Sequence, residues 1–174
     1  MMLLNFTIIV NILERNINLN IIIKPHHLLD IFKLYGKGLE NFIPDKKYNH
    51  DFYLIGNSVI ENKVDEIQFT YNHDDICKPC KYLKNNICID RFSYNNIIYG
   101  KNDYNEKLDI RLIHLLGIDD NKTYKFKDII YLINKKISLE LINLVWYSSN
   151  KEDNEIRYNF TKKGIEKYIL KYHL

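Results

Sequence analysis

Apolar positions near the start of the chain follow two different periods. Leu19 to Lys24 is a short run of β-favouring residues, which predicts a buried strand. Pro25 then suits the first turn of a helix, and Gly36 and Gly38 suit its end. The run between them repeats apolar residues at helical spacing, namely Leu28, Leu29, Phe32 and Leu34.

The pattern continues up to the cysteines. A second helix is predicted from Asn49 or His50 to about Asn62, with Phe52, Ile55, Val59 and Ile60 on one face. Asp65 to Tyr71 is predicted as a strand that leads the chain into a cysteine-bearing loop.

The second half of the chain reads as helical. Asp103 and Glu106 form a capping-box pattern for a helix through Leu116, and Gly117 would close it. Three further helices are predicted, at about 125–135, at 138–147 with Ser138 as N-cap, and after a Thr161 cap.

These elements predict one fold class. We expect a mostly helical α+β protein, with residues 19–174 forming a single compact domain around a small two- or three-strand sheet. Residues 1–18 begin with an apolar run, residues 1–10, that has no basic segment before it, is too short and too broken by Asn to span a bilayer, and has no cleavage site after it. They are interpreted as an N-terminal tail or strand, or as a spurious extension before the true start.

Charge and cysteine usage narrow the function classes. The net charge is +3, and the basic residues come as isolated pairs rather than one stripe, which argues against a nucleic-acid-binding role. An odd number of cysteines without an export signal indicates a reducing cytoplasm and no disulfide framework. No membrane association is expected.

All three cysteines fall within one polar stretch. Cys77 and Cys80 form a C-x2-C turn stiffened by Pro79, and Cys88 follows after seven residues. Buried free cysteines often act as small apolar residues, but this clustering favours a single metal site. Asp74 and Asp75 precede the turn and are expected to accept backbone N–H bonds there.

The metal is left open between two types. Structural zinc usually takes four protein ligands, so a zinc site here needs a His or Asp as the fourth. A four-iron cluster of the 4Fe–4S type can be held by three cysteines with one iron left for another ligand or a substrate. The spacing therefore favours iron–sulfur, with zinc as the alternative.

A paired-histidine motif offers the missing ligand. On a helix that starts at Pro25, Asp30 lies one turn from both His26 and His27. Such a set could complete a metal sphere or donate a proton beside it, whereas the structural alternative is a helix cap and an ordinary satisfied polar residue. His73, four residues before Cys77, is a further candidate ligand.

The segments 24–29 (KPHHLL), 36–38 (GKG) and 74–77 (DDIC), in this order, resemble a known family. It is the domain-of-unknown-function family 1284, small bacterial and archaeal proteins generally regarded as candidate iron–sulfur proteins. The resemblance covers about residues 21–90, and a variant subgroup extends it through C-terminal helices. Many members carry Cys where this chain has Asp30, which implies a carboxylate ligand or an open coordination position here.

Three functions follow as hypotheses. The first is an iron–sulfur protein, either an electron carrier with a redox partner protein or an enzyme whose open iron meets a small-molecule substrate. The second is a non-catalytic zinc module, with three cysteines and one histidine as ligands, for folding or partner binding. The third is a metal-free helical interaction domain. A cavity bordered by the cysteines, His26 and Asp30 would favour the enzyme.

Overall fold

The computed structural model describes residues 19–94, 96–147 and 149–174, so the predicted N-terminal tail lies outside the described residues. The first two predicted elements are confirmed, as strand β1 spans Leu19–Ile23 and helix α2 spans Pro25–Gly36. Lys24 is the extended residue between them, and Pro25 opens the helix as expected. Strand and helix therefore meet with a single residue between them.

A three-stranded sheet carries this junction. Strand β2, Val64–Phe69, lies in the middle, parallel to β1 and antiparallel to β7, Thr123–Lys125. The β1–β2 connection contains α2 and α3, Phe52–Ile60, since parallel neighbours require a long crossover. The predicted small sheet is confirmed, although β7 was not anticipated.

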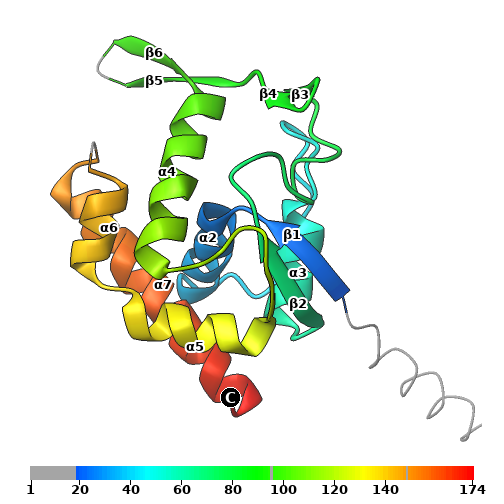
Figure 1. Ribbon diagram of the computed structural model, residues 1–174, viewed down its shortest axis with the longest axis vertical. Helices are drawn as coiled ribbons and strands as arrows, with labels where there is room; N and C mark the ends of the chain where they lie inside the picture. The colour runs from blue at the N-terminus through cyan, green and yellow to red at the C-terminus, as the bar shows by residue number, and fades with distance from the viewer. Residues whose placement is uncertain (1–18, 95, 148) are drawn as a thin grey trace, which may run out of the picture.

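Two short hairpins follow β2. The first pairs β3, Leu83–Lys84, with β4, Ile87–Cys88, and the second pairs β5, Arg91–Tyr94, with β6, Ile97–Gly100. Figure 1 shows the β5–β6 hairpin extending beyond the end of α4, at the end of the molecule away from the C-terminus.

Four helices complete the fold: α4 Lys101–Leu116, α5 Phe126–Lys136, α6 Leu139–Val145 and α7 Lys151–Tyr172. Gly117 ends α4 in the left-handed region, with φ at 65°, and Ser138 caps α6 by accepting the Leu141 N–H at 3.1 Å. Both ends are as predicted. The architecture confirms the mostly helical α+β class.

Two predicted helix starts are wrong. Helix α4 begins after Gly100, two residues before Asp103, so Asp103 and Glu106 form no capping box. Helix α7 begins after Asn150, whose side chain accepts the Asp153 N–H at 2.7 Å. Thr161 is consequently not a cap but a fully buried residue inside that helix.

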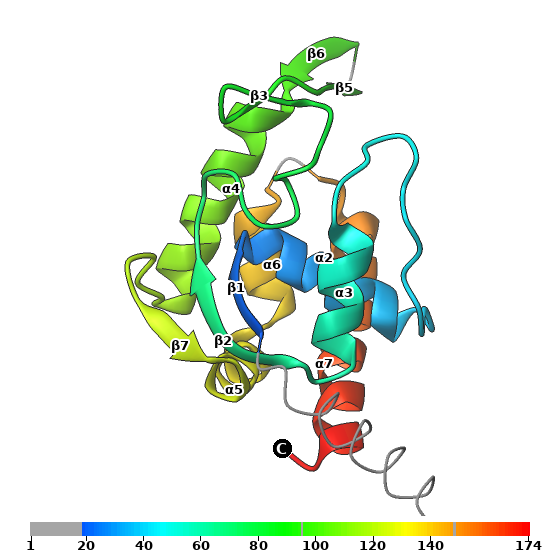
Figure 2. The same ribbon diagram turned by 90° about the vertical axis from the view of Figure 1, so that its right-hand side faces the viewer.

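Helix α2 is central, packing along α7 and against α3 and α4 (Figure 2). The α2–α7 crossing is close enough that a Cβ on Gly36 would lie 1.9 Å from the Phe160 carbonyl oxygen. A Cβ on Gly164 would lie 1.9 Å from the Phe32 carbonyl oxygen. This contact fixes the end of α2 and thereby the position of its N-terminal residues.

Candidate metal centre

Buried polar side chains concentrate at the start of α2. Of the six that the described residues contain, four meet there: Lys24, His26, Asp74 and Asp109. Burying such groups costs free energy unless hydrogen bonds compensate, so a cluster of them marks a candidate site.

Two carboxylates from distant segments cap the first turn of α2. Asp74 Oδ2 accepts the Lys24 N–H at 2.8 Å, and Asp109 Oδ1 accepts the His26 N–H at 2.9 Å. Both supply acceptors for N–H groups that have no partner inside the helix, and their negative charge suits the positive end of the helix dipole. Helix α2 therefore begins without a cap from a neighbouring residue, and two carboxylates from distant parts of the chain take that role.

The same carboxylates orient both histidines. His26 Nδ1 lies 2.7 Å from Asp109 Oδ2, and His27 Nδ1 lies 2.7 Å from Asp74 Oδ2. The two rings are adjacent, with centroids 4.2 Å apart. With each Nδ1 engaged by a carboxylate, Nε2 is the atom left for a metal or a substrate.

The histidines were predicted to act together with Asp30, but their carboxylate partners are Asp109 and Asp74. Asp30 instead binds Lys33 and the Nη1 of Arg157, the latter at 3.2 Å. Although burial opposes ionisation, Lys33 and its other charged neighbours hold the pKa of Asp30 below its ordinary value. Asp30 is thus a paired carboxylate at the edge of the site.

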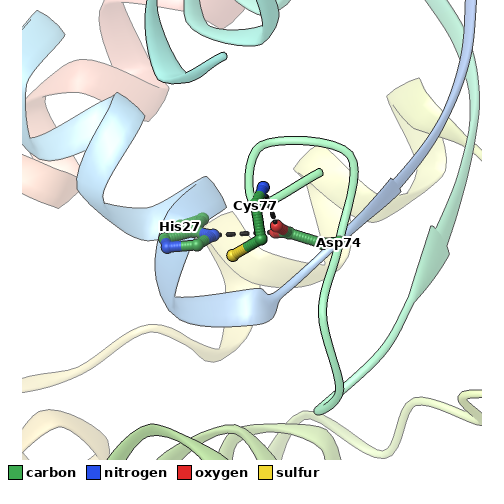
Figure 3. Close-up of side chains that lie close together, drawn as sticks. All are labelled: His27, Asp74 and Cys77. Atoms are coloured by element: carbon green, nitrogen blue, oxygen red, sulfur yellow. Dashed lines mark hydrogen bonds and ion pairs between the residues drawn. The ribbon is translucent and has the colours of Figure 1, made fainter. Parts of the chain in front are cut away.

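The Asp-Asp turn has the predicted role. Asp74 Oδ1 accepts the Cys77 N–H at 2.9 Å, and Asp75 Oδ2 accepts the Ile22 N–H of β1 at 2.7 Å. The cysteine loop is thereby attached to both the strand and the helix. Figure 3 shows His27, Asp74 and the Cys77 side chain close together, with Asp74 bound to the other two residues.

A short hairpin carries the third cysteine. Cys80 N–H bonds to the Cys77 carbonyl at 2.9 Å, closing the C-x2-C turn. Asn85 and Asn86, both at positive φ, form the turn of the β3–β4 hairpin, and Leu83 pairs with Cys88 across it. Asn102 Oδ1 accepts the Cys88 N–H at 3.3 Å, joining the hairpin to α4.

One cavity of about 440 Å³ joins the predicted site residues other than His73. Cys77, Cys80 and Cys88 line it together with His26, His27 and Asp30. Other parts of its wall were not anticipated: Lys24, Tyr48, His50, Phe52, Tyr82, Asp90, Phe92, Lys101, Tyr104, Asn105, Leu108, Trp146, Ser149 and Arg157. His73, His114 and His173 do not line it.

The ligand atoms are not evenly spaced. Among the described residues, one group of three potential metal ligands has its ligand atoms within 4.8 Å of one another. This group is His27, Asp74 and Cys77. The three sulfurs do not form such a set. They share a cavity without converging on one point.

Electrostatics keep the Cys77 thiol protonated. Burial raises the pKa of Cys77 well above its usual value and the Asp74 charge adds to this, while the Lys24 ammonium opposes it. Asp74 itself stays ionised, since its hydrogen bonds and the nearby His27 outweigh burial and hold its pKa far below the ordinary value. A Cys77 thiolate therefore needs a bound cation.

Asp109 is the partner of His26, and it was not predicted from the sequence. Burial disfavours a charged His26, but the Asp109 carboxylate outweighs this and raises the pKa of His26 above its ordinary value. One feature of the sequence could have pointed to Asp109. It lies beside Leu108 and Leu112 on the apolar face of α4, where a buried charge requires a partner.

Comparison with known proteins identifies a family. The model of the family described as "Protein of unknown function (DUF1284)" matches residues 45–144, more than half of the chain. The chain belongs to this family. The matched range contains the cysteine loop, Asp74 and Asp109 but begins after the paired histidines and ends inside α6. No match was found among curated proteins or among solved structures.

Among the helices of the described residues, none combines the length and the apolar character that crossing a bilayer requires.

Proposed function

We propose that this DUF1284 protein is an iron–sulfur protein whose cluster is held by Cys77, Cys80 and Cys88. The observation that carries the proposal is that every cysteine of the chain lines one cavity beside two carboxylate-oriented histidines. Three thiols gathered at one wall are a suitable donor set for a cluster with one non-cysteine position.

The sulfur spacing supports a cluster over a single ion. Around one zinc with Zn–S bonds of about 2.3 Å, tetrahedral geometry puts the sulfurs about 3.8 Å apart. The three sulfurs are not all within 4.8 Å of one another. In a cluster each thiolate binds a different iron, so wider spacing is expected.

The histidines suit the remaining position. His27 is held by Asp74 close to the Cys77 sulfur, and His26 is held by Asp109 with its ring next to that of His27. A bound cluster with an open iron would supply a Lewis-acid or one-electron centre. The surrounding cavity favours a protein that takes a substrate there over a closed electron carrier.

A zinc module is the second candidate, and one observation favours it. His27, Asp74 and Cys77 already bring three ligand atoms together. However, both Asp74 oxygens already accept hydrogen bonds, from Lys24 and His27 on one side and from Cys77 on the other. In a zinc site, Asp74 would therefore orient His27 rather than bind the metal.

Anaerobic purification with iron, sulfide and zinc analysis and a visible absorption spectrum tests the proposal. We expect iron and sulfide in near-equal amounts and broad visible absorption. Stoichiometric zinc in a colourless preparation would contradict it and support the alternative.

Variants assign the ligands. Cys77→Ser, Cys80→Ser and Cys88→Ser should each lose most of the iron, and no other cysteine exists to substitute for them. His27→Ala should change the cluster's spectrum or its stability in air. His73→Ala is the matched control, as its imidazole does not line the cavity. Equal behaviour of the two histidine variants would remove His27 from the site.

A further inference from the structure

We propose that the cavity also binds a small oxyanion, the carboxylate or phosphate group of an organic ligand, through Arg157 and Lys24. That this ligand is the substrate of a cluster rests on the proposed function. The anion site itself rests only on the side chains described below.

Arg157 is the first recognition group. It reaches the cavity from α7, and its guanidinium carbon lies 4.2 Å from the centroid of the Trp146 ring. Nη1 binds Asp30, but Nε is buried and has no hydrogen-bond partner among the described residues. A buried N–H without an acceptor is costly, whereas an oxyanion would accept from it in the fork geometry that arginine provides.

Lys24 is the second recognition group. It is 5% exposed and lines the same cavity, yet none of the ion pairs found among the described residues includes it. Its ammonium lies close enough to act electrostatically on Cys77 and His26, which places the charge near the thiols. A buried lysine in this position requires a negative charge nearby.

Neither acidic residue of the cavity wall forms an ion pair with Lys24, and the nearby buried carboxylates Asp74 and Asp109 are paired with the histidines. Asp30 is paired with Lys33 and Arg157, and Asp90 is paired with Lys101 at 2.6 Å. The ligand would therefore add negative charge to a cavity whose own carboxylates are already engaged. The aromatic side chains Phe52, Phe92 and Trp146 in the wall could contact its carbon portion.

The chain offers a direct reporter of this site. Trp146 is its single tryptophan, is 5% exposed and lies under the Arg157 guanidinium. Intrinsic tryptophan fluorescence can therefore be titrated with inorganic phosphate and, separately, with acetate, on the protein as purified anaerobically and with sodium chloride as the ionic-strength control. Equilibrium dialysis with labelled phosphate or labelled acetate measures the same binding without fluorescence.

We expect a saturable response to at least one anion. Arg157→Met should weaken it at least tenfold, Arg157→Lys should weaken it less because the charge remains, and Lys24→Met should weaken it as well. Arg111→Met is the matched control, since Arg111 also lies on an aromatic ring, 4.9 Å from the Tyr147 centroid, but outside the cavity. If Arg157→Met does not fold, the titration of Arg157→Lys tests the anion site, and weaker binding than in the wild type is expected.

The outcomes separate the two proposals. A response to phosphate alone assigns a phosphate ligand, and a response to acetate alone assigns a carboxylate ligand. No saturable response by either method, or equal losses in the Arg111 and Arg157 variants, would overturn the anion site. Anion binding by a protein found to contain no iron would sustain this site while the cluster proposal fails.

Discussion

Asp74 is the residue on which the site depends most directly. Its carboxylate is 1% exposed and accepts hydrogen bonds from Lys24 N–H, Cys77 N–H and His27 Nδ1. These three partners belong to the helix start, the cysteine loop and His27, a candidate metal ligand. A change of one atom in Asp74 therefore alters three connections at once.

Asp74→Asn should destabilise the protein by about 3 kcal/mol. The amide NH2 group would face N–H donors that the carboxylate oxygen now accepts, so buried donors would be left without an acceptor. Asp45→Asn is the matched control. Asp45 also accepts two backbone N–H groups, from Lys47 and Tyr48, but in an exposed turn, so its loss of stability is expected to be clearly smaller. Urea unfolding of both variants measures this, and equal losses would contradict the assigned role.

At the same scale, the sequence grouped the candidate ligands but not the carboxylates that bind them. The cysteines, His26 and His27 are close in the chain or share a motif, so spacing alone could group them. His26 and Asp109 are 83 residues apart, and no local period connects them. Asp30 had the right helical spacing, but Arg157, distant in sequence, binds it.

Among the elements, the α2–α7 crossing sets the position of the site. Gly36→Ala and Gly164→Ala should each cost about 3 kcal/mol or prevent folding, since the added methyl would meet a backbone carbonyl that cannot rotate away. Gly100→Ala, with no atom within 4 Å of its added Cβ, is the control and should cost about 1 kcal/mol at most. Thermal unfolding compares the three, and a tolerated Gly36→Ala would show that the helices can separate.

Helix α7 also makes stability sensitive to alkaline pH. Burial raises the pKa of Tyr168 far above its ordinary value of 10.0, and the neighbouring Tyr172 and Tyr35 contribute. Above pH 10 the unfolded chain loses this proton while the folded chain keeps it, so unfolding becomes easier as pH rises. The additional slope is at most about 1.4 kcal/mol per pH unit.

Tyr168→Phe removes the titrating group and its hydrogen bond to Asn62 Oδ1, 2.7 Å long. The variant should be less stable at neutral pH, yet its stability should fall less steeply above pH 10 than that of the wild type. Urea unfolding between pH 8 and pH 11 measures both slopes. If the stability of the variant and of the wild type fell equally steeply with pH, Tyr168 would ionise as easily in the folded state as in the unfolded state.

Helix ends marked by their own residues were predicted from the sequence, whereas features that depend on contacts with distant parts of the chain were not. Pro25, Gly117 and Ser138 mark helix ends through their own backbone or side chain, and the sequence alone located these ends. Strand β7 has three residues and exists because β2 pairs with it. Thr161 resembled a cap, but burial against the core kept it inside α7.

For the whole molecule, the proposed cluster would connect segments from across the sequence. Its removal with a chelator should lower the free energy of unfolding by at least about 2.7 kcal/mol, the value expected for a ligand present at 100 times its Kd. The unfolding midpoint before and after removal measures this. Cys80→Ser should show no such difference, and an equal midpoint for loaded and stripped wild type would argue against a structural contribution from the metal.

The Asp74 hydrogen bonds also bear on the order of folding events. Asp74 lies 50 residues from Lys24 and 47 from His27, and the two segments meet only when β1 pairs with β2. Such non-local contacts form late because closing the intervening chain costs entropy first. The cysteine loop is thus organised by a chain that has already folded, unlike a zinc finger, whose metal drives folding. Loading of the proposed metal would then be a step after synthesis that the cell can delay or withhold, and a peptide spanning only the three cysteines should bind that metal more weakly than the whole protein.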